Sequence, residues 1–281
     1  MANDETLESE GIQDKPGWAS GELDTKITLL DEKTLPKEMT IHHLVVEALL
    51  KHYGRKHILK GVSFSMASGE VVGFLGPNGA GKTTAFYSIM GFIKPDGGKV
   101  LLDGMDITHE PMYRRARAGI SYLPQEASVF RRLSVADNIK VVLETRKDLS
   151  KGERKDRIQL LLEELGIQDL AKQQAYSLSG GERRRTEIAR ALALDPKFLL
   201  LDEPFAGIDP KAVYEIKMII RKLADRNIGI LITDHNVRDT LQITSHSCII
   251  SDGKVVVAGS KDEILGNELA RTVYLGHSFD M

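Results

Sequence analysis

The chain has 281 residues, of which 42% are hydrophobic, so it is long enough to bury the core of one large domain or two modest ones. Its net charge of −2 argues against a general nucleic-acid binder, since such proteins normally carry a basic excess. A single cysteine, Cys248, excludes an intramolecular disulfide, and no apolar stretch approaches the ~20 residues that cross a bilayer. We therefore expect a cytoplasmic protein in which any membrane role depends on a partner.

Residues 1–40 differ in composition from the rest of the chain. Acidic residues outnumber basic ones there, apolar residues are few, and no helical or strand period is sustained. Such a composition cannot bury enough apolar surface to fold alone. We predict a disordered acidic extension over this range; a regulatory or partner-binding arm is the alternative interpretation.

Ordered structure is predicted from Ile41 onward. Residues 44–49 and 58–66 have the composition of strands, with Tyr53 in the turn between them. A short apolar run, 71–75, then leads into a stretch that reads G-x-x-x-x-G-K-T and opens a helix. That stretch consists of Gly76, Pro77, Asn78, Gly79, Ala80, Gly81, Lys82 and Thr83.

This order of strand, loop and helix is the context that a phosphate-binding P-loop requires. Glycines let backbone N–H groups point inward, and the helix N-terminus adds partial positive charge. Lys82 can reach the β- and γ-phosphates of a nucleotide, and the Thr83 hydroxyl can bind Mg²⁺. The alternative is an ordinary glycine-rich turn between a strand and a helix.

From residue 111 to residue 177 the pattern is predicted to be helical. Ser134 with Asp137, and Ser150 with Glu153, have the spacing of capping pairs at helix N-termini. After the second pair, apolar residues recur at the positions i, i+3, i+4 and i+7 of a helix face, namely Ile158, Leu161, Leu162 and Leu165. We expect a compact helical insert within an α/β domain.

Alternation of strands and helices resumes after this insert. Residues 198–201 and 228–232 are apolar runs typical of buried strands, and 251–253 marks a hairpin turn. Several strand–helix units around a P-loop imply a mainly parallel sheet covered on both faces. The α/β domain is expected over 41–258, followed by a C-terminal helical tail over 259–281.

Two acidic residues, Asp202 and Glu203, follow the strand predicted at 198–201. A carboxylate at the end of a buried strand near a P-loop occupies the position that holds Mg²⁺ in many nucleotide sites. Glu203, one residue further on, could polarise the water that attacks the γ-phosphorus.

A second glycine-rich helix start lies at Leu178–Glu182, which reads L-S-G-G-E. Ser179 and Glu182 have capping spacing and predict a helix to about Leu194. Arg183–Arg185 are expected on the outer side of this helix or at an interface, without a nucleotide role. This helix N-terminus would be a second anion site. Two such sites suit a dimer in which each nucleotide lies between the P-loop of one subunit and the Ser179 helix of the other.

The L-S-G-G-E stretch and its arginine-rich helix resemble the signature of ATP-binding-cassette (ABC) ATPases, whose other motifs follow in order between residues 41 and 258. The resemblance implies ATP hydrolysis with Mg²⁺, a RecA-like mainly parallel core, an N-terminal antiparallel β subdomain and a helical insert. It implies that Tyr53 stacks on adenine. It also implies that the nucleotide site includes Thr84, Gln125, Ser179, Gly180, Gly181 and Glu182. It also implies metal ligands at Thr83, Gln125 and Asp202, catalytic roles for Glu203 and His235, and a dimer contact at Asp209.

Three segments, 122–135, 233–241 and 273–279, resemble more specifically the ATPases of lipopolysaccharide exporters. This resemblance implies a homodimer on the cytoplasmic face of the inner membrane, docked on two different permease subunits and driving lipopolysaccharide extraction. Phe130 and Arg131 are expected to contact the permease. The alternatives are an importer ATPase, such as one for branched-chain amino acids, and a non-transport ABC protein; a small-molecule P-loop kinase would have no use for L-S-G-G-E.

Overall fold

The structure, a computed structural model, describes residues 40–276. The acidic extension expected over 1–40 therefore lies outside the described residues, except for Thr40, and so do residues 277–281. Among the residues that are described, none of the helices is both long and apolar enough to span a bilayer.

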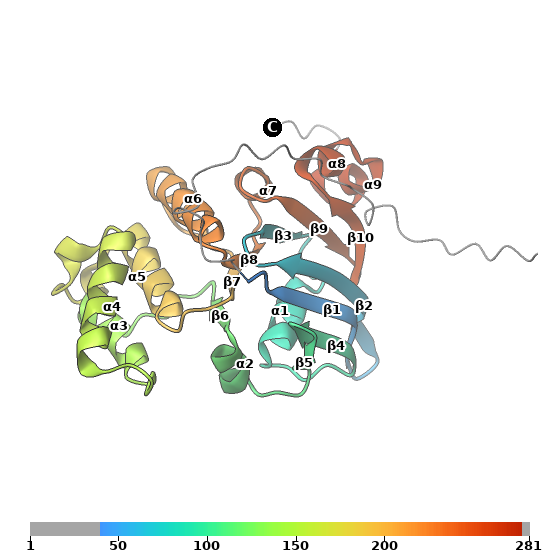
Figure 1. Cartoon of the computed structure of the whole chain (residues 1–281). Helices are drawn as coiled ribbons and strands as arrows, with labels where there is room; N and C mark the ends of the chain where they lie inside the picture. The colour runs from blue at the N-terminus through green and yellow to red at the C-terminus, as the bar shows by residue number, and fades with distance from the viewer. Residues whose placement is uncertain (1–39, 277–281) are drawn as a thin grey trace, which may run out of the picture. The chain divides into compact units, whose positions relative to one another are not determined.

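A six-stranded sheet forms the centre of the described part of the chain (Figure 1). Its strands, in spatial order, are β10 (Lys254–Gly259), β9 (His246–Ser251), β3 (Val71–Leu75), β8 (Gly229–Thr233), β7 (Phe198–Asp202) and β6 (Ile120–Leu123). All neighbouring pairs are parallel except β10 with β9, the hairpin predicted at 251–253. The sequence-based prediction of a mainly parallel sheet is confirmed.

Both faces of this sheet are buried, which explains the unbroken apolar runs in its strands. In β7, Phe198 and Leu200 join one apolar cluster, whereas Leu199 and Leu201 join another on the opposite face. The first cluster includes side chains from β1 (His43–Tyr53), β2 (Lys56–Ala67), β4 (Gly97–Leu102) and α1 (Lys82–Met90). The second includes side chains from α5 (Gly180–Leu192) and α6 (Pro210–Asp225).

A second, antiparallel sheet combines two strands that precede the P-loop with two that follow it, in agreement with the antiparallel β subdomain that the resemblance implied. Its strands, in spatial order, are β2 (Lys56–Ala67), β1 (His43–Tyr53), β4 (Gly97–Leu102) and β5 (Met105–Asp106). The first two are longer than the apolar pattern predicted, so Tyr53 is the last residue of β1 and not part of the turn.

The expectation of a purely helical stretch over 111–177 is wrong at β6. The chain forms α2 (Met112–Ala118), turns at Gly119 with φ 113°, and enters β6 as the edge strand of the six-stranded sheet. The four residues of β6 are too few to show a period, and their burial against β7 decides their conformation. The helical insert therefore begins after Leu123.

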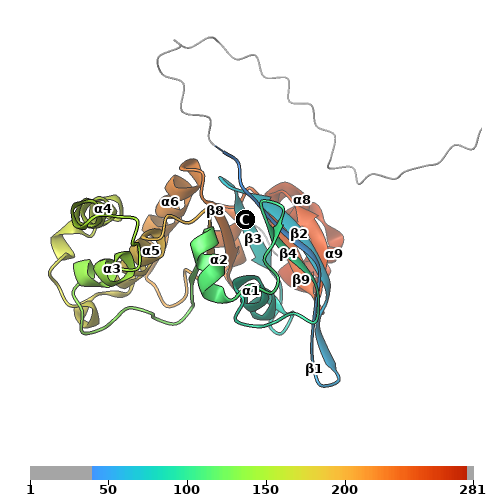
Figure 2. The ribbon, with the colours of Figure 1, turned by 60° about the horizontal axis from the view of Figure 1, so that its bottom comes forward.

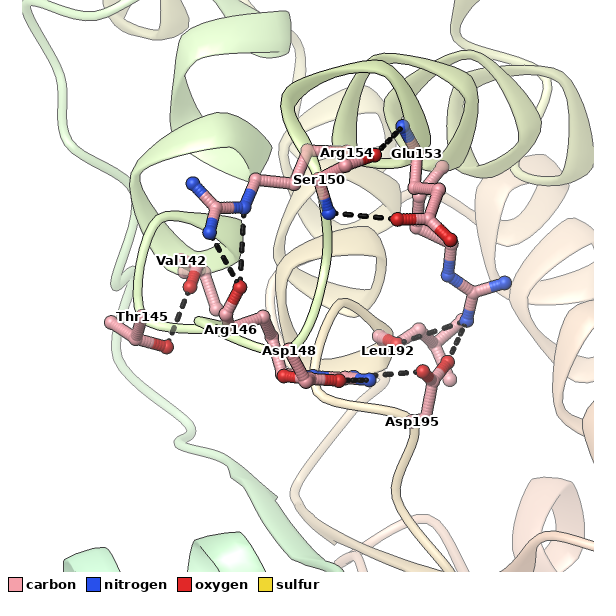
Figure 3. Close-up of polar contacts among 10 residues, drawn as sticks. Val142, Thr145, Arg146, Asp148, Ser150, Glu153, Arg154, Leu192 and Asp195 are labelled. Atoms are coloured by element: carbon pink, nitrogen blue, oxygen red, sulfur yellow. Dashed lines mark hydrogen bonds and ion pairs between the residues drawn. The ribbon is translucent and has the colours of Figure 1, made fainter.

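The insert contains α3 (Val135–Leu143) and α4 (Lys151–Glu164), which gather beside α5 in both views (Figures 1 and 2). Ser134 and Ser150 cap these helices as predicted, and Ser150 forms a complete capping box with Glu153. Asp195, just after α5, accepts a hydrogen bond of 2.8 Å from Arg146, which lies between α3 and α4 (Figure 3). This contact and the shared apolar cluster tie the insert to α5.

The expected helical tail is present within the described residues. It forms α8 (Lys261–Gly266), α9 (Glu268–Ala270) and a π-helical turn (Arg271–Leu275), after the short α7 (Val237–Leu241) and the β9–β10 hairpin. Ile264 and Ala270 are buried with Leu75 and Ile249 of the sheet. The tail therefore packs on the α/β domain and shares a core with it.

Arg115 of α2 provides a stability prediction. Its guanidinium is buried and donates to the carbonyl oxygens of Ser88, Ile89, Thr108 and Glu110, and burial lowers its pKa to about 10. Arg115→Met should lower the free energy of unfolding by about 3 kcal/mol, because buried carbonyl groups lose their donor. Urea unfolding measures this loss.

The neighbouring Arg114→Met is the control, since Arg114 is exposed and contacts the surface carboxylate of Glu110 and the exposed ring of Tyr113. Its unfolding midpoint should match that of the unchanged protein. Equal midpoints for the two variants would show that Arg115 does not support the fold in this way.

Candidate functional site

The candidate site lies where neighbouring parallel strands end at one edge of the six-stranded sheet. Strand β3 leads into Gly76 of the P-loop, β6 into Pro124 and Gln125, β7 into Glu203, and β8 into Asp234 and His235. Because these strands run in the same direction, their carboxyl ends meet at this edge, the usual ligand position in an open α/β sheet.

The P-loop borders a cavity of about 280 Å³. Residues predicted from the sequence supply most of its wall, while Lys56 and Ile58 of β2 were not predicted. The lining residues are Lys56, Ile58, Asn78, Gly79, Gly81, Lys82, Thr83, Thr84, Glu203 and His235. A cavity with a helix N-terminus, an ammonium group and loop N–H groups in its wall suits an anionic phosphate group.

Lys82 is held back against its own loop. Its buried Nζ donates to the carbonyl oxygens of Gly76, at 2.6 Å, and Pro77, at 3.1 Å. Burial lowers the pKa of the Lys82 ammonium, while the nearby carboxylates of Glu203 and Asp202 act in the opposite direction. Both of these hydrogen bonds go to neutral carbonyl groups, so an incoming phosphate would give this buried cation an anionic acceptor.

Asp202 is a buried carboxylate fixed by two hydroxyl groups. Thr233 donates to Oδ1 at 2.6 Å, and Tyr122 donates to Oδ2 at 3.1 Å. Burial is the main cause that raises the pKa of Tyr122, so its hydroxyl remains a donor. Sequence reasoning missed both hydroxyls, because only the folded sheet brings β6 and β8 to the end of β7. An oriented carboxylate close enough to act on the Lys82 ammonium fits the oxygen ligands that Mg²⁺ prefers.

Glu203 lies at the meeting point of three strand ends. Its Oε2 accepts a hydrogen bond of 2.6 Å from Gln125 Nε2, and its Oε1 lies 2.6 Å from His235 Nε2. Its φ is 45°, a conformation that non-glycine residues rarely adopt and that concentrates at functional sites. The structure therefore brings together Gln125, Glu203 and His235.

Asp234, which sequence reasoning did not single out, joins two of the loops at this edge. It is buried, and its carboxylate accepts hydrogen bonds from the N–H groups of Phe205, at 3.3 Å, and Asn236, at 2.8 Å. Burial raises the pKa of Asp234. Its place beside His235 was the only sequence signal that could have found it.

The L-S-G-G-E residues lie outside the P-loop cavity. Ser179 caps α5 in a complete capping box with Glu182, as predicted, and the helix ends at Leu192, close to the predicted end at about Leu194. A Cβ atom on Gly181 would lie 2.7 Å from Ala212 at the start of α6, which Asp209 caps. Ser179, Gly180, Gly181 and Glu182 thus form, with the Asp209 turn, a second polar helix start apart from the first.

The expectation that Arg183–Arg185 all lie on the outer side of the helix or at an interface is wrong for Arg184. Arg184 is only 5% exposed and donates to the carbonyl oxygens of Pro124 and Asp202. Arg185 pairs with Glu215 of α6. Sequence periodicity could not reveal this burial, because the partners are backbone groups of distant segments.

Tyr53, Phe130 and Arg131 lie away from the cavity lining. The Tyr53 ring is 52% exposed, and the Lys51 ammonium lies 5.4 Å from its centroid. Phe130 is 46% exposed, with the Arg190 guanidinium 4.6 Å from its ring centroid. Arg131 is exposed beside it. Exposed positions leave these side chains accessible to a ligand or partner.

The chain is similar to known proteins over most of its length. A sequence model of the ABC transporter family matches residues 59–206. The lipopolysaccharide export system ATP-binding protein LptB of Acidithiobacillus ferridurans is 55% identical over 238 residues, which cover 85% of this chain and 98% of that protein. LptB of Escherichia coli K12 is 52% identical over 236 residues, covering 84% and 98%.

Solved structures give the same family. An ATP-binding cassette of an ABC transporter in its ADP conformation has a TM-score of 0.75 and 28% identity, covering 85% of this chain and 100% of that one. A dimeric cassette bound to ADP and Pi has a TM-score of 0.69 and 25% identity, covering 78% and 98%.

The P-loop backbone provides a prediction with a matched control. A Cβ atom on Gly76 would lie 2.1 Å from the carbonyl oxygen of Ile250, whereas one on Gly79, also at positive φ, would meet open space. Gly76→Ala should cost about 3 kcal/mol of unfolding free energy because a backbone atom must move. Gly79→Ala should cost only about 1 kcal/mol, the strain of its φ. Urea unfolding compares the two variants, and equal losses would contradict this packing.

Proposed function

The chain belongs to the ABC transporter family of ATP-binding proteins, and on this premise we propose that it is the ATP-hydrolysing subunit of a lipopolysaccharide export system. The observation that carries this proposal is its identity of 55% and 52% to two LptB proteins over 98% of their lengths. Similarity over nearly the whole of those proteins extends beyond the nucleotide motifs that ABC ATPases share.

ATP would bind in the cavity at the P-loop. Loop N–H groups and Lys82 would hold its phosphates, and Thr83 and Asp202, with Gln125, would hold Mg²⁺. When bound, Mg²⁺ neutralises negative charge on the β- and γ-phosphates. The fit is supported by the buried Lys82, which points at its loop, and by Asp202, which two hydroxyl donors orient.

Glu203 is the proposed general base. Its carboxylate would accept a proton from the water that attacks the γ-phosphorus, leaving ADP and phosphate. Gln125 and His235 each contact one of its two oxygens, so the group is positioned before any substrate arrives. His235 would then contact the γ-phosphate from its place in the cavity wall.

The active form is proposed to be a homodimer with two shared sites. The L-S-G-G-E helix start lies outside the cavity of its own chain, which supports a role toward the nucleotide of a second copy. Asp209 and its turn lie beside that helix start and would contribute to the same contact. Tyr53, exposed at the end of β1, would stack on the adenine.

The dimer would dock on two permease subunits at the cytoplasmic face of the inner membrane. Phe130 is the proposed anchor, with Arg131 beside it. Its exposed ring follows Gln125 by five positions along the chain and lies in no helix or strand. An exposed aromatic side chain with an arginine over it is the kind of residue that dominates interface energies.

The proposed base predicts the behaviour of Glu203→Gln. Turnover should fall by about 10²–10⁴-fold because no carboxylate accepts the proton, while ATP binding persists because Lys82, Thr83 and Asp202 remain. The variant should accumulate as an ATP-bound dimer, measurable by gel filtration together with phosphate release. Exposed Glu126→Gln is the control and should hydrolyse ATP normally. Near-normal turnover by Glu203→Gln would rule out this role.

The proposed anchor predicts the behaviour of Phe130→Ala. Truncation of an interface aromatic costs about 2 kcal/mol, so permease docking should weaken about thirtyfold. Co-purification with the permease subunits from mild detergent measures docking, and thermal unfolding and ATP binding should not change. Leu160→Ala, at an exposed position of α4, is the control. Normal docking by Phe130→Ala, or a much lower unfolding temperature, would contradict the assignment.

A further inference from the structure

Residues 124–130, which connect Gln125 to Phe130, lie in no helix or strand. Their conformation must therefore be fixed by contacts from elsewhere in the fold. Asn138 of α3 binds the backbone N–H and carbonyl oxygen of Phe130. Three charged side chains of α5, spaced three residues apart, bind the backbone of Pro124 and Ser128: Arg184, Glu187 and Arg190. We call these three residues the α5 clamp.

Arg184 bridges two parts of the candidate site. Its Nη1 donates to the carbonyl oxygen of Pro124 at 2.8 Å, directly before Gln125, and its Nη2 donates to that of Asp202 at 3.2 Å. The side chain is 6% exposed. A shift of the Asp202 strand end relative to Pro124 must therefore move this guanidinium or break one of its bonds.

Glu187 continues the connection toward the surface. Its Oε2 accepts from Arg184 Nη1 at 3.1 Å, and its Oε1 accepts from the Ser128 N–H at 2.6 Å. Its side chain is 2% exposed, so water cannot replace either bond. Arg190 donates to the Ser128 carbonyl oxygen and lies over the Phe130 ring. A chain of contacts thus runs from Asp202 through the α5 clamp to Phe130.

Stability alone does not account for the α5 clamp. A buried ion pair contributes little net stability compared with apolar side chains of similar size. Within residues 40–276, moreover, the buried Nε atoms of Arg184 and Arg190 have no hydrogen-bond partner. A network with unused donors can take up a second arrangement, which suits a switch better than a fixed support.

We propose that Arg184, Glu187 and Arg190 are positioning residues that transmit nucleotide occupancy at Gln125 and Asp202 to the surface around Phe130. As to its biological meaning, this inference rests on the proposed function, in which that surface docks on a permease. The coupling itself is a property of the single chain and can be measured without any partner.

The test is amide hydrogen exchange of residues 125–130 with and without a non-hydrolysable ATP analogue and Mg²⁺. In the unchanged protein, the analogue should alter exchange there by about fivefold or more, the lower range of typical couplings between sites. Glu187→Gln should reduce this response to less than about twofold while the protein stays folded and binds the analogue normally. Glu215→Gln, which removes the partner of Arg185 on another face of α5, is the matched control and should respond fully.

A second variant tests the proposal even if Glu187→Gln does not fold. Arg184→Met combined with Glu187→Gln removes both buried charges and leaves neither unpaired. It should also lose the response at 125–130. No response in the unchanged protein, or a full response in a folded Glu187→Gln or double variant, would overturn the proposal.

Permease experiments separate this inference from the proposed function. With the permease reconstituted, Glu187→Gln should still dock. The change in its ATPase rate on permease binding should be smaller than that of the unchanged protein by about fivefold or more. Suppose that Phe130→Ala docks at normal strength and Glu187→Gln loses the exchange response. This result would refute Phe130 as the docking anchor and leave the coupling through the α5 clamp intact. Normal responses of Glu187→Gln in both assays would refute coupling through the α5 clamp and leave the proposed function untouched.

Discussion

The parallel register of β3, β8, β7 and β6 is the constraint on which the rest of the structure depends. It pairs Asp202 with Thr233, whose hydroxyl donates to the Asp202 carboxylate. A slip of one residue would exchange the two faces of a strand, so that Leu199 and Leu201 would enter the wrong apolar cluster. The register that buries the apolar side chains is therefore the one that sets the carboxylates beside the P-loop.

Unfavourable features concentrate at this edge of the sheet. Burial lowers the pKa of Lys82 and raises that of Asp234, so the fold opposes the charge on both groups. Glu203 adds backbone strain with its φ of 45°. Local rules are broken where a site must be pre-organised, and the apolar clusters on both faces of the sheet offset the cost. A bound anion beside Lys82 would relieve part of it.

Sequence patterns predicted those features that local chemistry decides. The P-loop, the capping boxes at Ser150 and Ser179 and the buried strand at 198–201 each depend on residues close together in the chain, and the structure confirms their positions. Strand β6 could not be predicted, because its four residues take their conformation from pairing with β7.

The side chains that complete the candidate site were beyond sequence reasoning for a related reason. The hydroxyls of Tyr122 and Thr233 become partners of Asp202 only when three strands are aligned. Arg184 belongs to an arginine run that resembles a solvated face, and only tertiary contacts with Pro124 and Asp202 show that it is buried. Such roles depend on contacts between segments that lie far apart in the chain, which local sequence patterns do not show.

Helix α5 connects the parts of the fold that the nucleotide and a partner would each contact. Its capped N-terminus packs on the start of α6, where Gly181 leaves no room for a larger residue beside Ala212. Its middle holds the carbonyl oxygen of Asp202, and its C-terminal end accepts a hydrogen bond from Arg157 of α4. Thirteen residues of helix span about 20 Å, so a displacement at one end must appear at the other unless the helix itself deforms. A nucleotide at the N-terminus of α5 and a permease subunit at Phe130 would therefore both act on this one rigid helix. Binding of either one would shift α5 and so change the surface to which the other binds.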